Sequence, residues 1–167
     1  MYYFYFDASA LVKRYTQEIG SEKTNFIFTN VPQNRLMCSI LAVVELFWIF
    51  VRKKNDGRIT NLDYSQAGKN LNYEIIDSGS EFKTISIPDT LVLNSMSIIE
   101  THSLNSVDAI VLRSALDIAA ELHNTGNTLI LVASDQRLLR AAQEEGLLVF
   151  NPEVDPQQTL TDWIMHI

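Results

Sequence analysis

YFYFDASALVK, residues 3–13, passes from a run of aromatic side chains to the start of an amphipathic helix, and one acid, Asp7, stands between them. A short apolar run of this kind predicts a buried strand over residues 3–6, and Ser9 begins the helical pattern. Asp7 is therefore expected at the carboxyl end of the first strand, the edge at which open α/β sheets bind ligands. The alternative is that Asp7 only caps the following helix.

The rest of the chain alternates short buried strands with helices. Further strands are expected over residues 35–38, 83–87, 128–132 and 147–150. Helices are expected over residues 20–30, 40–54, 61–78, 88–101, 105–126 and 136–146, and a last one begins at residue 155. The helix over residues 40–54 is apolar enough to be buried over most of its circumference. This alternation predicts a single domain over residues 1–167, a three-layer α/β/α sandwich with a mostly parallel central sheet.

Composition and charge favour a folded cytoplasmic protein over a secreted or membrane-bound one. Hydrophobic residues make up 47% of the 167 positions, as in a folded domain, and the one cysteine, Cys38, fits a reducing cytoplasm. No Lys or Arg precedes Lys13, and the longest apolar run is too short to span a membrane, so we expect a cytoplasmic protein without a membrane anchor. The net charge of −7 does not favour binding of nucleic acid by bulk charge alone.

Three further acids occupy informative positions. Asp135 follows an apolar strand and precedes a helix, as Asp7 does, and Asp108 lies in the first turn of its helix. Glu45 lies within an apolar helix, where an unpaired carboxylate costs several kcal/mol. Each acid also has a simpler explanation, which is a helix cap or dipole contact for the aspartates and a narrow solvated stripe for Glu45.

Convergence of the four acids at one sheet edge would call for a cation. Two carboxylates about 5 Å apart repel by roughly 3 kcal/mol at an effective dielectric constant of about 20. A divalent ion removes this repulsion, and oxygen ligands without nearby His or Cys favour Mg²⁺ or Mn²⁺ over Zn²⁺. A site of this kind is typical of phosphoryl-transfer enzymes.

The same residues resemble the motifs of PIN-domain ribonucleases, most closely the VapC-like toxins of type II toxin–antitoxin systems. The four matching segments are residues 7–13 (DASALVK), 39–46 (SILAVVEL), 106–109 (SVDA) and 133–139 (ASDQRLL). Ser134 stands where threonine is more usual in the family, and Gln136 stands where some members have a further acid. Residues 56–103 carry no motif of the family.

The resemblance implies the PIN fold and a metal-dependent endoribonuclease that hydrolyses phosphodiester bonds with Mg²⁺ or Mn²⁺. It implies catalytic and metal-binding roles for an acidic quartet: Asp7, Glu45, Asp108 and Asp135. Ser9 and Ser134 would support the quartet, with Ser9 holding Asp7 or a water at the metal. The main candidates for contacts with RNA phosphates are Lys13, Arg14 and Arg137, with Arg52, Lys53, Lys54 and Arg140 as further basic residues. The implied partners are an RNA substrate, a small antitoxin and a second copy of the chain.

Two other functions remain open. A haloacid-dehalogenase-like phosphatase also has an acid at the end of its first strand, but it needs a second acid two residues later, where this chain has Ser9. A PIN-like domain that has lost catalysis could instead act as a binding module. The presence of all four acids weighs against that alternative.

Overall fold

The computed structural model describes residues 1–165, and the last two positions of the domain expected over residues 1–167 lie outside the described residues. At its centre is a parallel sheet with the strand order β3-β2-β1-β4-β5. The strands are β1 (Tyr2–Phe6), β2 (Leu36–Ser39), β3 (Lys83–Ile85), β4 (Thr128–Val132) and β5 (Leu148–Phe150). Because these strands are parallel, their carboxyl ends meet at one edge of the sheet.

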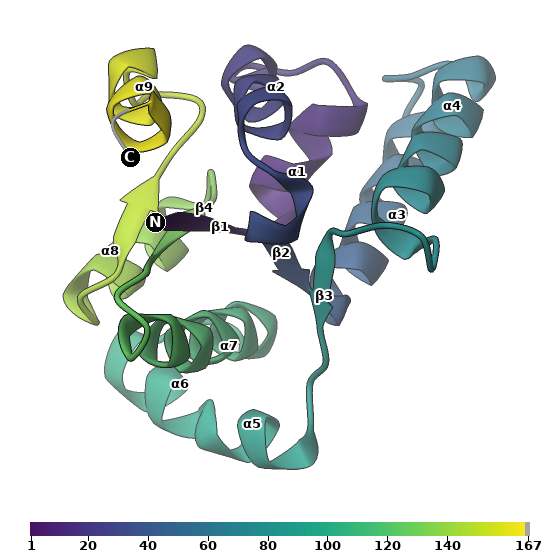
Figure 1. Ribbon diagram of the computed structural model, residues 1–167. Coiled ribbons are helices and arrows are strands. Elements are labelled where there is room, and N and C mark those ends of the chain that lie inside the picture. The colour runs from purple at the N-terminus through teal and green to yellow at the C-terminus, as the bar shows by residue number, and fades with distance from the viewer. Residues whose placement is uncertain (166–167) are drawn as a thin grey trace.

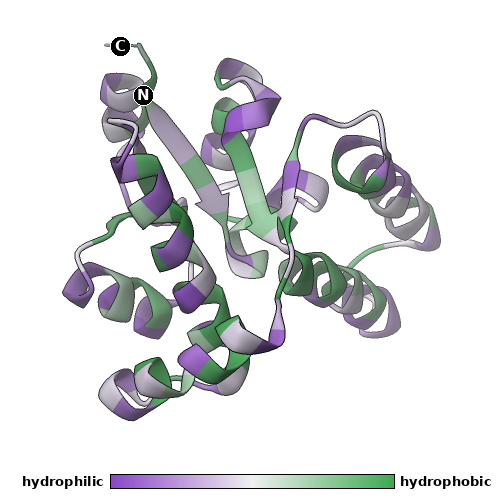
Figure 2. Cartoon of the chain, turned by 60° about the horizontal axis from the view of Figure 1, so that its bottom comes forward, coloured by the Kyte–Doolittle hydropathy of each residue, from purple (hydrophilic) through white to green (hydrophobic). Residues whose placement is uncertain are grey.

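The composition of β1 explains its place in the middle of the sheet. A parallel strand with helices over both faces is expected to be apolar on both. Phe4 and Phe6 pack into the core on one face, and Tyr5 packs into the core on the other. Burial of a side chain such as Phe6 stabilises the fold by roughly 1.5–3 kcal/mol. In Figure 2, β1 begins beside the N label and alternates pale purple tyrosines with green phenylalanines, and the helices around the sheet are striped in green and purple.

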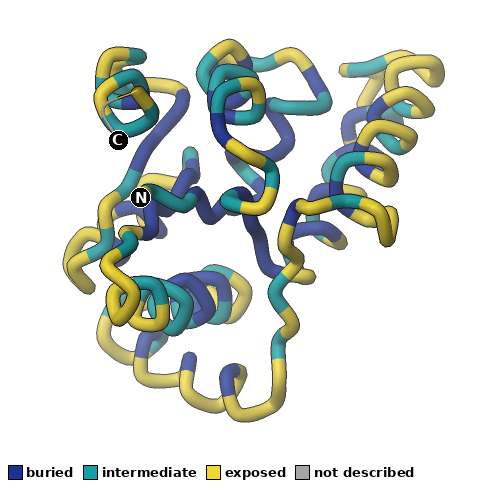
Figure 3. Tube along the Cα trace, viewed as in Figure 1, coloured by how far each residue is buried: buried dark blue, intermediate teal, exposed yellow. Residues whose placement is uncertain are grey.

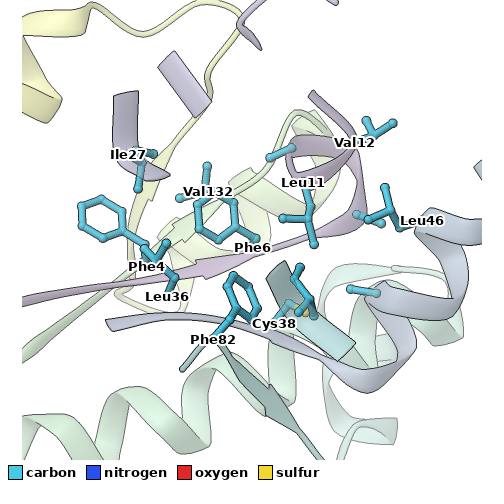
Figure 4. Close-up of a cluster of buried hydrophobic side chains, with 14 of the residues drawn as sticks. Phe4, Phe6, Leu11, Val12, Ile27, Leu36, Cys38, Leu46, Phe82 and Val132 are labelled. Atoms are coloured by element: carbon cyan, nitrogen blue, oxygen red, sulfur yellow. The ribbon is translucent and has the colours of Figure 1, made fainter. Parts of the chain in front are cut away.

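One face of the sheet is covered by helices from the first half of the chain together with the last helix. These are α1 (Ala8–Tyr15), α2 (Ser21–Asn30), α3 (Ile40–Asn55), α4 (Asn61–Leu71) and α9 (Gln157–Met165), above the sheet in Figure 1. Their apolar side chains form a core cluster with side chains of the strands, including Phe6, Leu36, Cys38 and Val132 (Figure 4). Cys38 is a buried free thiol.

The opposite face is covered by α5 (Asp89–Asn94), α6 (Met96–His102), α7 (Ser106–His123) and α8 (Gln136–Glu144). Apolar residues of α6, α7 and α8 form a second core cluster with Tyr5 and Met37 of the sheet. The three central strands, β2, β1 and β4, therefore lie largely buried between two helical layers, as the dark blue trace at the centre of Figure 3 shows. The expected three-layer α/β/α sandwich with a parallel sheet is confirmed.

Two expected helices are interrupted. The helix predicted over residues 61–78 is α4 followed by a π-helical turn, Asn72–Ile76. The helix predicted over residues 88–101 divides at Ser95 into α5 and α6. The Ser95 hydroxyl donates to the carbonyl oxygen of Val92 at 2.7 Å. A serine that bonds the backbone in this way competes with the regular helical pattern and favours a break.

The prediction that α3 is buried over most of its circumference is wrong. Its buried side is a stripe that includes Ala42, Val43, Leu46 and Phe50, which repeats at the helical period and packs on the sheet. The opposite side leaves apolar side chains exposed: Ile40, Val44, Phe47 and Trp48. A helix that is apolar on all sides is fully buried only when other elements pack against every side. In this single chain, other elements pack against one side of α3. Within residues 1–165, no helix has both the length and the apolar character needed to cross a membrane.

Candidate active site

Two acids of the expected quartet lie just after strands, and the other two lie in helices. Asp7 directly follows β1, and its backbone N–H donates to the carbonyl oxygen of Val132, the last residue of β4, at 3.0 Å. Asp135 is the N-cap of α8, just beyond the end of β4. Glu45 lies in α3, which begins directly after β2, and Asp108 lies in the first turn of α7. The topology thus directs these residues to the carboxyl edge of the sheet.

The carboxylate of Asp7 is held by two hydrogen bonds from Ser9, which is itself bonded to the loop after β4. Asp7 is the N-cap of α1, and its Oδ2 accepts hydrogen bonds from the Ser9 N–H at 3.0 Å and from the Ser9 hydroxyl at 2.5 Å. The Ser9 Oγ in turn accepts from the Ser134 N–H at 2.9 Å, which ties the loop after β4 to the loop after β1. Asp7 is therefore both a helix cap and a carboxylate fixed at the edge, and Ser9 holds it in place.

The other two aspartates are also fixed by capping bonds. The Oδ1 of Asp135 accepts from the N–H groups of Arg137 and Leu138 at 2.8 and 3.0 Å. Its Oδ2 accepts no hydrogen bond from residues 1–165 and remains available to a ligand. Asp108 receives a bond from the Asn105 side-chain amide at 2.6 Å, while its own N–H donates to Asn105 Oδ1 at 2.9 Å.

The electrostatics of the site indicate that the four carboxyl groups lie within range of one another. Burial raises the pKa of Asp7 above its ordinary value, and the charge of Asp135 adds to this rise. Burial, with added contributions from Asp7 and Asp108, raises the pKa of Glu45 to about 7. Burial, with added contributions from Asp7 and Asp135, raises the pKa of Asp108 to about 6. With a pKa of about 7, Glu45 can therefore hold a proton near neutral pH.

The donor atoms of the site fit a hard divalent cation. The donors at this edge are carboxylate and hydroxyl oxygens, which are the ligands that Mg²⁺ and Mn²⁺ prefer. The Oγ of Ser134 is buried and has no hydrogen-bond partner in the described part of the chain, so a ligand or a water could supply one. Within residues 1–165, no group of three or more Asp, Glu, His or Cys residues is arranged so that it could hold a metal ion. A protein site for Mg²⁺ needs only one or two carboxylates, because this ion keeps several of its waters.

The structure corrects two of the expected contacts with RNA phosphates. The side chain of Lys13 is only 2% exposed, and its ammonium pairs with Glu18 at 3.2 Å and Glu153 at 2.6 Å. The guanidinium of Arg14 forms a two-point ion pair with Glu74, through Nε at 3.1 Å and Nη2 at 2.5 Å. Both cations already have carboxylate partners, and Lys13 has no surface to offer a phosphate.

Arg137 differs from these residues and stays at the surface beside the acids. Its guanidinium donates to the backbone carbonyl oxygen of Ser103, and its charge lowers the pKa of Asp108. Lys53, one of the further basic candidates, is buried and pairs with Glu18. Of the three main candidates, Arg137 alone is placed near the acidic edge.

Sequence analysis did not identify Asn105, which orients Asp108. Asn105 is the N-cap of α7 and exchanges two hydrogen bonds with the acid three residues later. The spacing N-x-x-D ahead of an apolar helix is the signal that could have found it, since a cap residue and a polar residue three positions on commonly pair in this way.

Comparison with known proteins agrees with this fold. A family model described as "PIN domain" matches residues 4–144. PAE2754 from Pyrobaculum aerophilum has a similar structure, with 20% identity, a TM-score of 0.62 and 100% of each chain covered. FitAcB from Neisseria gonorrhoeae shows 14% identity and a TM-score of 0.62, covering 91% of this chain and 99% of that one. A toxin–antitoxin complex from Klebsiella pneumoniae shows 18% identity and a TM-score of 0.53, covering 89% and 96%. No curated protein matches the chain.

Proposed function

This chain belongs to the PIN domain family, and from that membership we propose that it is a metal-dependent endoribonuclease that acts as a toxin. Proteins with PIN domains are generally nucleases. The observation that carries the proposal is a set of carboxyl groups at the sheet edge whose pKa values are raised by burial first and by one another's charge in addition: Asp7, Glu45 and Asp108. Such a set lowers stability unless a cation or substrate uses it. Family membership leaves the haloacid-dehalogenase-like phosphatase without support.

The acids at the sheet edge have different roles in the proposed reaction. Asp7, fixed by Ser9, and Asp135, with its free Oδ2, would be the carboxylates that hold Mg²⁺ or Mn²⁺, and Asp108 would add negative charge beside the ion. When bound, the ion would neutralise the phosphate and favour ionisation of a water. Glu45, with a pKa of about 7, is suited to accept a proton from the attacking water near neutral pH.

The proposed reaction is hydrolysis by in-line attack. The water oxygen forms a bond to phosphorus while the bond between phosphorus and O3′ breaks. The water proton passes to a carboxylate, and O3′ takes up a proton as it leaves. The products are a 3′-hydroxyl end and a 5′-phosphate end on single-stranded or looped RNA.

The test is cleavage of RNA by the purified protein and by Asp7→Asn. Asn is also a good N-cap, so this variant should keep its circular dichroism spectrum and lose cleavage in Mg²⁺ or Mn²⁺. Asp56→Asn, at an exposed position far from the motifs, is the matched control and should cleave normally. Full activity of Asp7→Asn, or of the unchanged protein in excess EDTA, would contradict the proposal. Binding of RNA without cleavage by the unchanged protein would favour the silent binding module.

We propose two further partners, a small antitoxin and a second copy of the chain. The similar fold of the Klebsiella pneumoniae toxin–antitoxin complex supports the first. An antitoxin arginine could pair with two carboxylates of the acidic edge, which is a favourable bidentate geometry. Exposed apolar side chains of α4 and α5, such as Leu62 and Leu93, could receive its apolar residues. A second copy would cover the exposed face of α3. A cytoplasmic site of action fits the single buried free thiol.

A further inference from the structure

A polar cavity of about 340 Å³ lies between the end of α6 and the outer face of α8. Its lining includes Thr101, His102, Ser103, Arg137, Arg140 and Glu144. Asp135 is the N-cap of α8, and Arg137, two residues later, lines the cavity. The cavity therefore starts within one helical turn of the acidic edge. This position places it beside the proposed reaction without including any of the four acids.

Two arginines give one end of the cavity a positive charge. Arg137 and Arg140 are three residues apart on α8, so their side chains share one face of the helix. Arg137 donates to the Ser103 carbonyl oxygen, which holds its guanidinium between the cavity and Asp108. Arg140 is exposed and forms no ion pair or hydrogen bond with any residue in the described range 1–165. A lone surface arginine is common, but this one lines a cavity with a second guanidinium.

At the other end of the cavity, His102 contacts two glutamates of the α8 end. The side chain of His102 is 6% exposed, and its two ring nitrogens lie 3.1 Å from Glu144 Oε2 and 2.6 Å from Glu145 Oε1. These contacts hold the end of α6 against the end of α8, so the cavity exists before any ligand binds. They also keep the Glu144 carboxylate in the cavity lining at the end away from Arg137, which favours binding of an anion beside the arginines. A preformed site loses little ordering entropy on binding.

We propose that this cavity binds one nucleotide of the RNA substrate, with its phosphate on Arg137 and Arg140, next to the phosphodiester at the acidic edge. The inference rests on the proposed function, because it names the part of the substrate that the nuclease site would need to hold. A chain of net charge −7 repels RNA as a whole, so a local pair of cations must offset that repulsion. Planar guanidinium groups bind phosphate oxygens bidentately. The volume lies at the lower end of small-ligand sites, which favours a single unpaired nucleotide over a duplex.

The test separates binding from cleavage by using Asp7→Asn as the background. Fluorescence anisotropy of a fluorescein-labelled, single-stranded oligoribonucleotide is measured over a series of salt concentrations. Adding Arg140→Ala should weaken binding by roughly tenfold, the lower end for a hydrogen bond to a charged group. It should also reduce the slope of log K against log salt by about 0.7, the value for one phosphate on a single strand.

Two variants control for charge and geometry. Arg58→Ala removes the same charge from an exposed arginine that pairs with Asp56, and it should leave affinity and slope unchanged. Arg140→Lys keeps the charge without the planar fork, so it should keep the slope and recover part of the affinity. In the active protein, Arg140→Ala should raise KM for RNA and leave kcat nearly unchanged.

The outcomes distinguish this inference from the proposed function. Cleavage by the unchanged protein, combined with an Arg140→Ala variant that behaves like Arg58→Ala, would overturn the nucleotide site and leave the nuclease intact. RNA binding that depends on Arg140, without cleavage in any divalent ion, would support the cavity and overturn the nuclease. If RNA is neither bound in the anisotropy assay nor cleaved in the activity assay, both the nucleotide site and the nuclease function are wrong.

Discussion

Asp7 combines two roles that have opposite effects on stability. As the N-cap of α1 it stabilises that helix, by about 1 kcal/mol for a typical cap. As a buried carboxylate near Asp135 it has a raised pKa, which means that its ionised form is disfavoured in the folded protein. The protein keeps an acid here although Ser or Asn would cap the helix without this cost. This balance is typical of a site retained for binding.

The same argument predicts how stability depends on pH without metal. Glu45 and Asp108 have pKa values of about 7 and about 6, above those of an unfolded chain. Between about pH 4.5 and 7 the folded state therefore keeps protons that the unfolded state releases, and stability falls as pH rises. Glu18 and Asp63 have lowered pKa values. Their contributions to stability are therefore lost only below this pH window, and they do not mask the fall in stability between about pH 4.5 and 7.

The measurement is the melting temperature across that pH range in EDTA and in Mg²⁺. The Tm should decline towards pH 7 in EDTA, and Mg²⁺ should reduce the decline because a cation stabilises ionised carboxylates. Glu45→Gln should flatten the EDTA curve, and NaCl at equal ionic strength is the control for screening. A flat curve for the unchanged protein in EDTA would mean that the pKa values of Glu45 and Asp108 are not raised in the folded protein.

The sequence predicts which residues lie at the site only where the evidence comes from neighbouring positions in the chain. The acids follow strands or begin helices, and those patterns can be read from neighbouring positions. The true environment of Lys13 could not be predicted, since its partner Glu153 lies on a distant part of the chain. The same holds for Arg14 and Glu74, which meet only in the folded protein.

At the scale of elements, periodicity identified the strands and the two layers, because each follows from local alternation of apolar residues. The break at Ser95 was missed, since a single side chain bonding its own backbone leaves the apolar spacing unchanged. The exposed face of α3 was missed for a different reason. Its apolar residues, such as Val44 and Trp48, indicate a covered surface but do not indicate that the cover belongs to the same chain.

The turn between α6 and α7 gives a prediction about backbone conformation. Ser103 has φ 54° and ψ 34°, a left-handed conformation that L residues adopt at a cost, and its N–H donates to the Ile99 carbonyl oxygen. Ser103→Val should therefore lower the free energy of unfolding by about 1–3 kcal/mol relative to Ser103→Gly, since Gly adopts this conformation freely. Urea unfolding measures the difference. Ser97→Val, in α6 itself, is the control and should cost only a few tenths of a kcal/mol. Equal losses at both positions would contradict the argument.

For the whole molecule, net charge and the acidic edge favour a basic partner. The chain carries a charge of −7, and an arginine from such a partner would pair with carboxylates that otherwise repel one another. We predict that co-expression with the product of an adjacent small gene yields a complex without ribonuclease activity. One Arg→Ala substitution in that partner should restore cleavage with little loss of association, and Lys→Ala substitutions serve as controls. Inhibition that survives every arginine substitution would rule out an inserted arginine even if the complex is real.

The central position of β1 also determines when an active molecule can exist during translation. β1 is made first, but one of its two neighbours, β4, comes from residues 128–132, and Tyr2 pairs there with Thr128. Pairing over such a sequence separation is slow, and until it forms β1 keeps an open edge. A nascent chain that has passed residue 108 carries Asp7, Glu45 and Asp108 but neither the strand that aligns them nor Asp135. The proposed site is therefore complete only after most of the chain has emerged from the ribosome, and a chain that ends before residue 128 lacks both β4 and Asp135.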